Sequence, residues 1–148
     1  MNEILQLSDF PESFGDEATL DEFMSRPSQA LINDLAALDG DIMVLGVGGK
    51  MGPTLARLAK RAAPDKRVIG VARFSEVRLV EQLQSHEVET IICDLLDREA
   101  VSSLPEIKNI IFMAGRKFGS TGAEDLTWAM NVHAPAIVAE RFRAANIV

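Results

Sequence analysis

Three glycines spaced three residues apart are the part of the sequence with the clearest chemical meaning. Gly46, Gly49 and Gly52 follow a short apolar run at residues 42–45, and a helical pattern begins at Pro53. Four apolar residues in a row have the length of a buried parallel strand. A glycine turn between a strand and a helix brings backbone N–H groups close to a phosphate, and the helix N-terminus adds a partial positive charge. The stretch therefore predicts a nucleotide-binding loop.

Each glycine of this loop has its own expected role. Gly46 permits the tight turn off the strand, and Gly49 lets the backbone approach a pyrophosphate closely. Gly52 lets the helix pack against its strand. Together with the residues between them, the glycines give the expected phosphate-binding set: Gly46, Gly48, Gly49, Lys50, Met51 and Gly52.

Arg73 bears on the choice of cofactor. It follows a second apolar run at residues 67–72, where a dinucleotide fold meets the adenosine ribose. An acid at this position bonds both ribose hydroxyls of NAD, whereas an arginine accommodates the 2′-phosphate of NADP. A merely solvated arginine after a strand is the alternative. Arg73 therefore favours NADP, with NAD as the second choice.

Two further strand ends supply the rest of the expected cofactor site. Asp94 stands where a carboxylate can accept from an adenine amino group, with Leu95 beside it. Capping of the next helix is the alternative role for Asp94, although Asp97 is the better N-cap. Ala114 and Gly115 are small enough to let the backbone pass close to the cofactor's ribose and nicotinamide.

The polar residues near the end of the chain have less clear roles than those at the strand ends. Asn131 lies in the last predicted helix, where it can hold a backbone group or a water, and we include it among the cofactor-binding residues. Arg116 and Lys117 could steer an anionic substrate, but loop cations are more often only solvated. One cysteine and two histidines show no metal-ligand spacing, so we expect no metal site.

Strands and helices alternate along residues 41–148, which predicts an α/β fold. The pattern indicates a Rossmann-like doubly wound parallel sheet of four strands in the order 3-2-1-4, truncated before the fifth strand. The expected strands are 42–45, 67–72, 88–93 and 108–114, and the expected helices are 53–63, 75–86, 97–104 and 123–145, the last with a kink at Pro135.

Charge separates the first forty residues from the rest. Residues 1–40 hold nine acids and one base, whereas residues 41–148 hold thirteen acids and fourteen bases. We therefore expect an acidic N-terminal helical extension followed by a partial NAD(P)-binding domain. Thr19 and Glu22 have the form of a capping box for a first helix. The extension should pack against the sheet edge, with a partner-docking or dimerising arm as the alternative.

Composition also narrows the partners. A net charge of -7 without a basic stripe argues against nucleic acid. No apolar run approaches the ~20 residues of a membrane span, and the first residues lack the features of a signal peptide. The single cysteine, Cys93, excludes an internal disulfide and fits a reducing compartment. We expect a cytoplasmic protein that binds neither nucleic acid nor membrane.

These motifs together resemble those of the extended short-chain dehydrogenases/reductases, the NAD(P)-dependent epimerase and dehydratase family acting on nucleotide sugars. Residues 45–52 match that family's TGxxGxxG, except that Leu45 replaces threonine. Asp94 matches its adenine-binding aspartate, residues 113–115 its small-residue motif, and Asn131 the asparagine of its fourth helix. The resemblance covers residues 41–148 and implies a dinucleotide cofactor.

The family's catalytic pair is missing from the chain. Its chemistry uses a YxxxK tyrosine and lysine, and this sequence has no tyrosine. We therefore expect no catalytic residue here and no oxidoreductase activity by that route. The resemblance implies the cofactor-binding part of a longer epimerase/dehydratase-like oxidoreductase, whose full-length form would take a nucleotide sugar. A non-catalytic NADP-binding sensor or regulatory module is the alternative.

Truncation before a fifth strand carries an expectation about assembly. It would leave the fourth strand, at Ile110, Ile111, Phe112 and Met113, as an open apolar edge. It would also expose Ile137, Val138 and Phe142 on the last helix. We therefore expect a homo-oligomer, formed through that edge or that helix.

Overall fold

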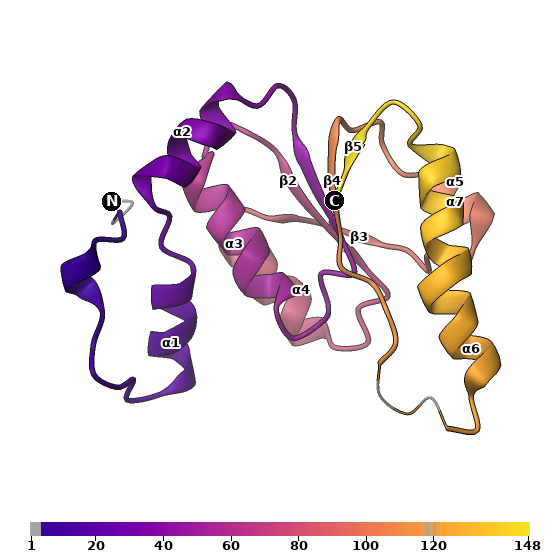
Figure 1. The fold of residues 1–148 in the computed structure, drawn as a ribbon, viewed down its shortest axis with the longest axis horizontal. Helices are drawn as coiled ribbons and strands as arrows, with labels where there is room; N and C mark the ends of the chain where they lie inside the picture. Colours follow the sequence, from indigo (N-terminus) through magenta and orange to yellow (C-terminus); the bar gives the residue numbers. More distant parts are fainter. Residues whose placement is uncertain (1–3, 118, 120) are drawn as a thin grey trace.

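A parallel sheet of five strands in the order β3-β2-β1-β4-β5 forms the centre of the protein (Figure 1). The computed structural model describes residues 4–117, 119 and 121–148. The predicted doubly wound α/β fold is confirmed. The strands are β1 (Ile42–Leu45), β2 (Val68–Ala72), β3 (Glu89–Ile92), β4 (Asn109–Phe112) and β5 (Asn146–Ile147).

Helices cover both faces of this sheet (Figure 1). One face carries α3 (Gly52–Ala62) and α4 (Val77–Ser85), and the other carries α5 (Arg98–Ser102), α6 (Glu124–Trp128) and α7 (Ala134–Arg141). None of the helices in the described part of the chain is both long and apolar enough to cross a membrane.

The central strand β1 divides the core between the two faces. All four of its residues are buried. Successive side chains of a strand point to opposite faces. Met43 and Leu45 accordingly join the core under α5 and α7. Ile42 and Val44 join the core under α3 and α4. Burial on both faces explains why this strand is a continuous apolar run rather than an alternating one.

The fifth strand is the main departure from the expected topology. Residues 146–148 lie beside β4 and pair with it in parallel. The Phe112 N–H donates to the Val148 carbonyl at 2.7 Å, and the Val148 N–H donates to the Ile110 carbonyl at 3.0 Å. The expectation of a sheet truncated before the fifth strand, with β4 as an open edge, was therefore wrong.

The same correction applies to the last helix. It ends at Arg141 rather than near residue 145, and this frees the final residues to form β5. Ile137, Val138 and Phe142 are each at most 3% exposed, packed against the sheet and α5 rather than facing solvent. The two surfaces on which we based association of the chain are thus covered.

The helix preceding β5 is interrupted where Pro135 predicts. A π-helical turn, η2 (Ala129–His133), joins α6 to α7, and Pro135 falls in the first turn of α7. Proline lacks an N–H and its ring collides with the carbonyl four residues earlier, so a wider turn relieves the clash.

The N-terminal arm, residues 4–40, packs on α3 and not on a sheet edge (Figure 1). It contains the 3₁₀ turn η1 (Leu7–Asp9), α1 (Glu17–Met24) and α2 (Gln29–Ala37). Leu35 of α2 reaches the core beneath α3. The helices of the arm therefore pack on a neighbour that the sequence did not predict.

The cap of the arm's first helix also differs from the one expected. Asp16 caps α1 by accepting from the Thr19 N–H at 2.7 Å, and Ser28 caps α2 by accepting from the Leu31 N–H at 3.2 Å. The Thr19–Glu22 capping box does not form. Asp16 sits one residue before the helix, which is the position an N-cap requires.

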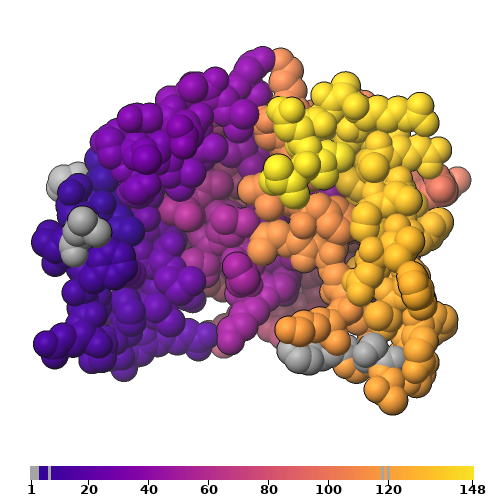
Figure 2. Space-filling model, viewed as in Figure 1, coloured from indigo at the N-terminus to yellow at the C-terminus, as the bar shows by residue number. Residues whose placement is uncertain are grey.

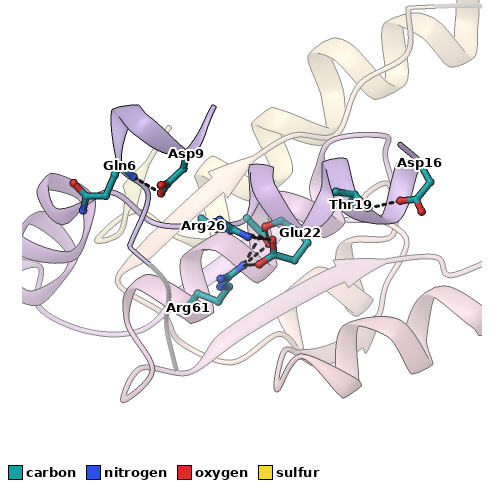
Figure 3. A network of polar contacts seen from close by, with 8 residues as sticks. Gln6, Asp9, Asp16, Thr19, Glu22, Arg26 and Arg61 are labelled. Carbon is teal, nitrogen blue, oxygen red and sulfur yellow. Dashed lines mark hydrogen bonds and ion pairs between the residues drawn. The ribbon is translucent and has the colours of Figure 1, made fainter. Parts of the chain in front are cut away.

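Glu22 instead anchors the arm to α3 (Figure 3). Its carboxylate accepts from Arg26 and, at 3.1 Å, from Arg61 of α3. Arg61 also donates to the hydroxyl of Ser25, a residue that is 0% exposed, at 2.9 Å. The pKa of Glu22 is lowered, first by the Arg26 hydrogen bond and further by Arg61. This anchor therefore acts above the ordinary Glu22 pKa of 4.5 and is lost as the pH falls through the lowered value.

Replacing Arg61 by alanine should loosen the arm. The free energy of unfolding should fall by about 1–3 kcal/mol, because the buried Ser25 hydroxyl and the Glu22 carboxylate lose a charged partner. Urea unfolding measures the loss, and amide hydrogen exchange should speed up most in α1. Arg98→Ala is the matched control, since Arg98 pairs with Glu140 where both side chains are more than half exposed. Equal losses in the two variants would contradict the anchoring role.

Candidate functional site

A cavity of about 1040 Å³ lies where β1, β2, β3 and β4 end. Carboxyl ends of neighbouring parallel strands meet at one edge of a sheet, which is where open α/β folds bind ligands. Figure 2 shows the surface hollowed next to the N-terminal arm. Of the predicted cofactor-binding residues, the cavity is lined by Gly46, Gly48, Gly49, Lys50, Met51, Arg73, Asp94, Leu95, Ala114 and Gly115.

Two glycines of the loop are required by the fold itself. Gly46 has a φ of +87°, and a Cβ there would lie 2.6 Å from the Ala114 nitrogen. At Gly52 a Cβ would lie 2.2 Å from the Val47 carbonyl oxygen. Gly46 therefore lets the β1 loop pass against the β4 loop, and Gly52 lets α3 start directly on the turn.

Gly49 is different, because the fold leaves room for a side chain there. A Cβ would meet only the Gly46 carbonyl oxygen, at an ordinary contact distance of 3.5 Å. The position also lines the cavity. A glycine that the fold does not need, beside a cavity, is consistent with close approach of a ligand to the backbone.

The turn presents backbone donors to the cavity. Among the described residues, the N–H groups of Gly48, Lys50 and Met51 have no acceptor, while the Gly49 and Gly52 N–H groups bond within the turn. The first bond of α3 runs from the Leu55 N–H to the Met51 carbonyl, so the helix begins at the cavity. Free N–H groups at a helix N-terminus form an anion-binding site.

Arg73 lies at the end of β2 with its side chain exposed in the cavity wall. No ion-pair partner for it occurs within the described part of the chain, so its guanidinium is available to a ligand. The next residue, Phe74, has a φ of +46° and also lines the cavity. Backbone in this region is uncommon outside glycine and often occurs beside functional sites.

Asp97, and not Asp94, caps α5, as the sequence predicts. Asp97 caps α5, accepting from the Glu99 and Ala100 N–H groups at 2.9 and 3.1 Å. Among the described residues, the Asp94 carboxylate accepts only from the nearby Leu96 N–H, at 3.0 Å, through one oxygen. Asp94 is therefore not the helix cap, and it remains in the cavity wall.

Asn131 lies outside the residues that line the cavity. In the π-helical turn its side chain accepts from the Arg116 N–H at 2.7 Å and donates to the Arg116 carbonyl at 2.8 Å. These bonds fix the backbone after Gly115 next to the cavity. The Arg116 guanidinium donates to the Gly119 carbonyl, and neither it nor Lys117 lines the cavity.

Cys93 behaves as a buried strand residue. It is 4% exposed, and burial, together with Asp94 and Asp97, raises the pKa of its thiol. A thiol with a raised pKa is a poor nucleophile and a poor metal ligand. Over the described residues, no group of histidine, cysteine or carboxylate side chains is arranged to hold a metal.

Sequence reasoning missed one wall of the cavity altogether. Four residues of α1 line it: Glu17, Leu20, Asp21 and Met24. The Asp21 carboxylate accepts from the Thr54 hydroxyl of α3 at 3.3 Å. No motif marks these residues, because they reach the cavity only through packing of the arm on α3. Their helical spacing was the available sequence signal, but the same spacing occurs in helices that line no site.

The fold is shared with solved structures. The chain is similar to UDP-glucose-4-epimerase from Stenotrophomonas maltophila, solved with bound NAD and formylated UDP-arabinopyranose, at 16% identity and a TM-score of 0.60. It is also similar to L-threonine dehydrogenase from Clostridium difficile, at 16% and 0.58. A short-chain type dehydrogenase/reductase from Mycobacterium ulcerans matches at 16% and 0.57. No protein-family model and no curated protein matches the chain.

These matches cover most of this chain and a minor part of the others. The first two cover 73% and 72% of this chain and 34% of each of those proteins. The third covers 70% of this chain and 45% of its counterpart. The chain therefore spans between a third and a half of the proteins it resembles. It has the Rossmann-like fold of the short-chain dehydrogenases/reductases, as its motifs implied.

Proposed function

We propose that the chain binds NADP or NAD and is the cofactor-binding part of an epimerase/dehydratase-like oxidoreductase. The observation that carries the proposal is the loop at the end of β1. Its free N–H groups, the start of α3 and the room at Gly49 meet at one point of the cavity. A pyrophosphate is the ligand that such a point recognises best.

The remaining residues fit the other parts of a dinucleotide. The pyrophosphate would accept from the N–H groups of the turn, and Arg73 would face the ribose that carries the 2′-phosphate of NADP. Asp94 would accept from the adenine amino group, and the small residues Ala114 and Gly115 would leave space for the nicotinamide ribose. The bound cofactor would supply hydride transfer.

The chemical step itself is proposed to use groups beyond this chain's own residues. The sequence contains no tyrosine, and we expect the purified 148-residue protein not to reduce a carbonyl. A nucleotide sugar is the proposed substrate of a full-length protein. We further propose a cytoplasmic protein that forms homo-oligomers, for which the exposed apolar residues Trp128 and Val132 offer a surface.

A non-catalytic NADP-binding sensor or regulator is the second candidate. The arm favours it, because an added element that lines the cavity offers a way to couple occupancy to a partner. The source gene beyond Val148 separates the two: a YxxxK within some tens of codons supports the enzyme, and a stop codon supports the regulator.

Gly49→Val should abolish dinucleotide binding and leave the fold intact. A Cβ at this position meets nothing closer than 3.5 Å, and the valine side chain would occupy the space where the pyrophosphate would approach the backbone. Calorimetric titration with NADP measures binding, and a thermal melt checks the fold. Gly52→Ala is the contrasting variant, which should lower stability by more than about 2 kcal/mol because its Cβ would collide with the Val47 carbonyl. Wild-type affinity in the Gly49 variant would remove the phosphate-loop interpretation.

Arg73→Ala should reduce the difference in affinity between NADP and NAD. A charge-assisted bond to the 2′-phosphate is worth about ten- to a hundredfold in affinity, whereas NAD has no such group. Dissociation constants for both cofactors, measured on the wild-type protein and on the variant, give the NADP-to-NAD affinity ratio of each. Lys117→Ala, which alters a cation outside the cavity, should leave it unchanged. An NADP-to-NAD affinity ratio that is the same in the wild-type protein and in Arg73→Ala would rule out this role of Arg73.

A further inference from the structure

One complete face of α1 lines the cavity. Glu17 and Asp21 form an acidic stripe four residues apart, and Leu20 and Met24 form an apolar stripe beside it. Residues three and four apart share a helix face, so the four side chains lie together. This face belongs to an arm whose acidic composition contrasts with the nearly neutral remainder of the chain.

The contacts of Asp21 place this face on the α4 side of the cavity, which is the side proposed for the adenosine. Asp21 bonds Thr54 in the first turn of α3, and it also lines a small cleft with Gln82 of α4 and His86, the residue that follows α4. Helix α4 follows β2, the strand whose end carries Arg73. The nicotinamide end lies on the other side, at Ala114 beside β4.

The arm is held firmly enough for its charges to keep this position. The Arg61 guanidinium bonds the Glu22 carboxylate, the Glu22 carbonyl and the Ser25 hydroxyl (Figure 3). The Phe23 ring packs against Phe10 and Phe14, with centroids 5.1 and 5.2 Å apart. The acidic stripe of α1 is therefore a fixed part of the wall.

The wall of the cavity thus carries charges of both signs. The cavity is lined by the cations Lys50, Arg73 and Arg78 and by the acids Glu17, Asp21, Glu76 and Asp94. A 2′-phosphate adds about 1.5 to 2 negative charges, which nearby carboxylates repel. A 2′-hydroxyl adds none and can donate a hydrogen bond to a carboxylate.

We infer that α1 is a determinant of cofactor choice, in which Glu17 and Asp21 weaken binding of the 2′-phosphate against the attraction of Arg73. In dinucleotide folds that select NAD, the acid comes from the end of the second strand. Here Arg73 occupies that place, and the carboxylates come from the N-terminal arm. This inference rests on the proposed dinucleotide binding.

The test is the affinity of Glu17→Gln/Asp21→Asn for each cofactor at low ionic strength. NADP affinity should rise about three- to tenfold, while NAD affinity should change less than about twofold. The gain in NADP affinity should be smaller in 0.5 M salt, because exposed charges are then screened. Glu12→Gln is the matched control, since Glu12 is an exposed acid of the same arm that does not line the cavity.

Glu17→Gln alone guards against a folding defect. Glu17 is exposed on the helix surface, so its replacement should leave the fold intact and give part of the gain. An unchanged NADP-to-NAD ratio in both variants would overturn the inference while leaving dinucleotide binding in place. Wild-type protein that binds neither cofactor would overturn the proposed function, and the inference with it.

Discussion

The contact between Gly52 and the Val47 carbonyl governs how the site is built. With no side chain at Gly52, α3 begins immediately after the turn and its axis points at the ends of the strands. A Cβ there would lie 2.2 Å from the carbonyl oxygen, so any other residue forces the helix away from β1. Gly46 plays the same part toward the β4 loop. The anion-binding character of the turn follows from this packing, because the N–H groups of the turn and the helix N-terminus are left facing the cavity.

Residues that the sequence assigned to one site line one cavity because parallel strands impose this geometry. Asp94, Arg73 and Ala114 lie far apart along the chain, yet each follows the end of a strand by one or two residues. Once the strands are known to be parallel, their ends must meet at one edge of the sheet. The helix N-cap role of Asp97 was predictable for a similar reason, since it depends only on neighbouring residues.

The features that the sequence did not predict depend on contacts between residues that are distant along the chain. Glu22 was assigned to a local capping box, but its carboxylate pairs with Arg26 and with Arg61, which is 39 residues away. Nothing local distinguishes the two roles. The strand β5 was missed because two residues are too few for a pattern, and their pairing with β4 depends on where the preceding helix ends. The position of the arm, and with it the acidic wall of the cavity, likewise depends on contacts between residues distant along the chain.

The proposed function requires that a dinucleotide binds in the cavity at the ends of the strands. Titration of the isotopically labelled chain with NADP, followed by amide NMR shifts, measures this binding residue by residue. Dinucleotide binding should give shifts concentrated at residues 48–51, 94–95 and 114–115, which lie apart in sequence and line one cavity. Absence of shifts at millimolar NADP, or shifts clustered on the α5 and α7 face, would contradict it.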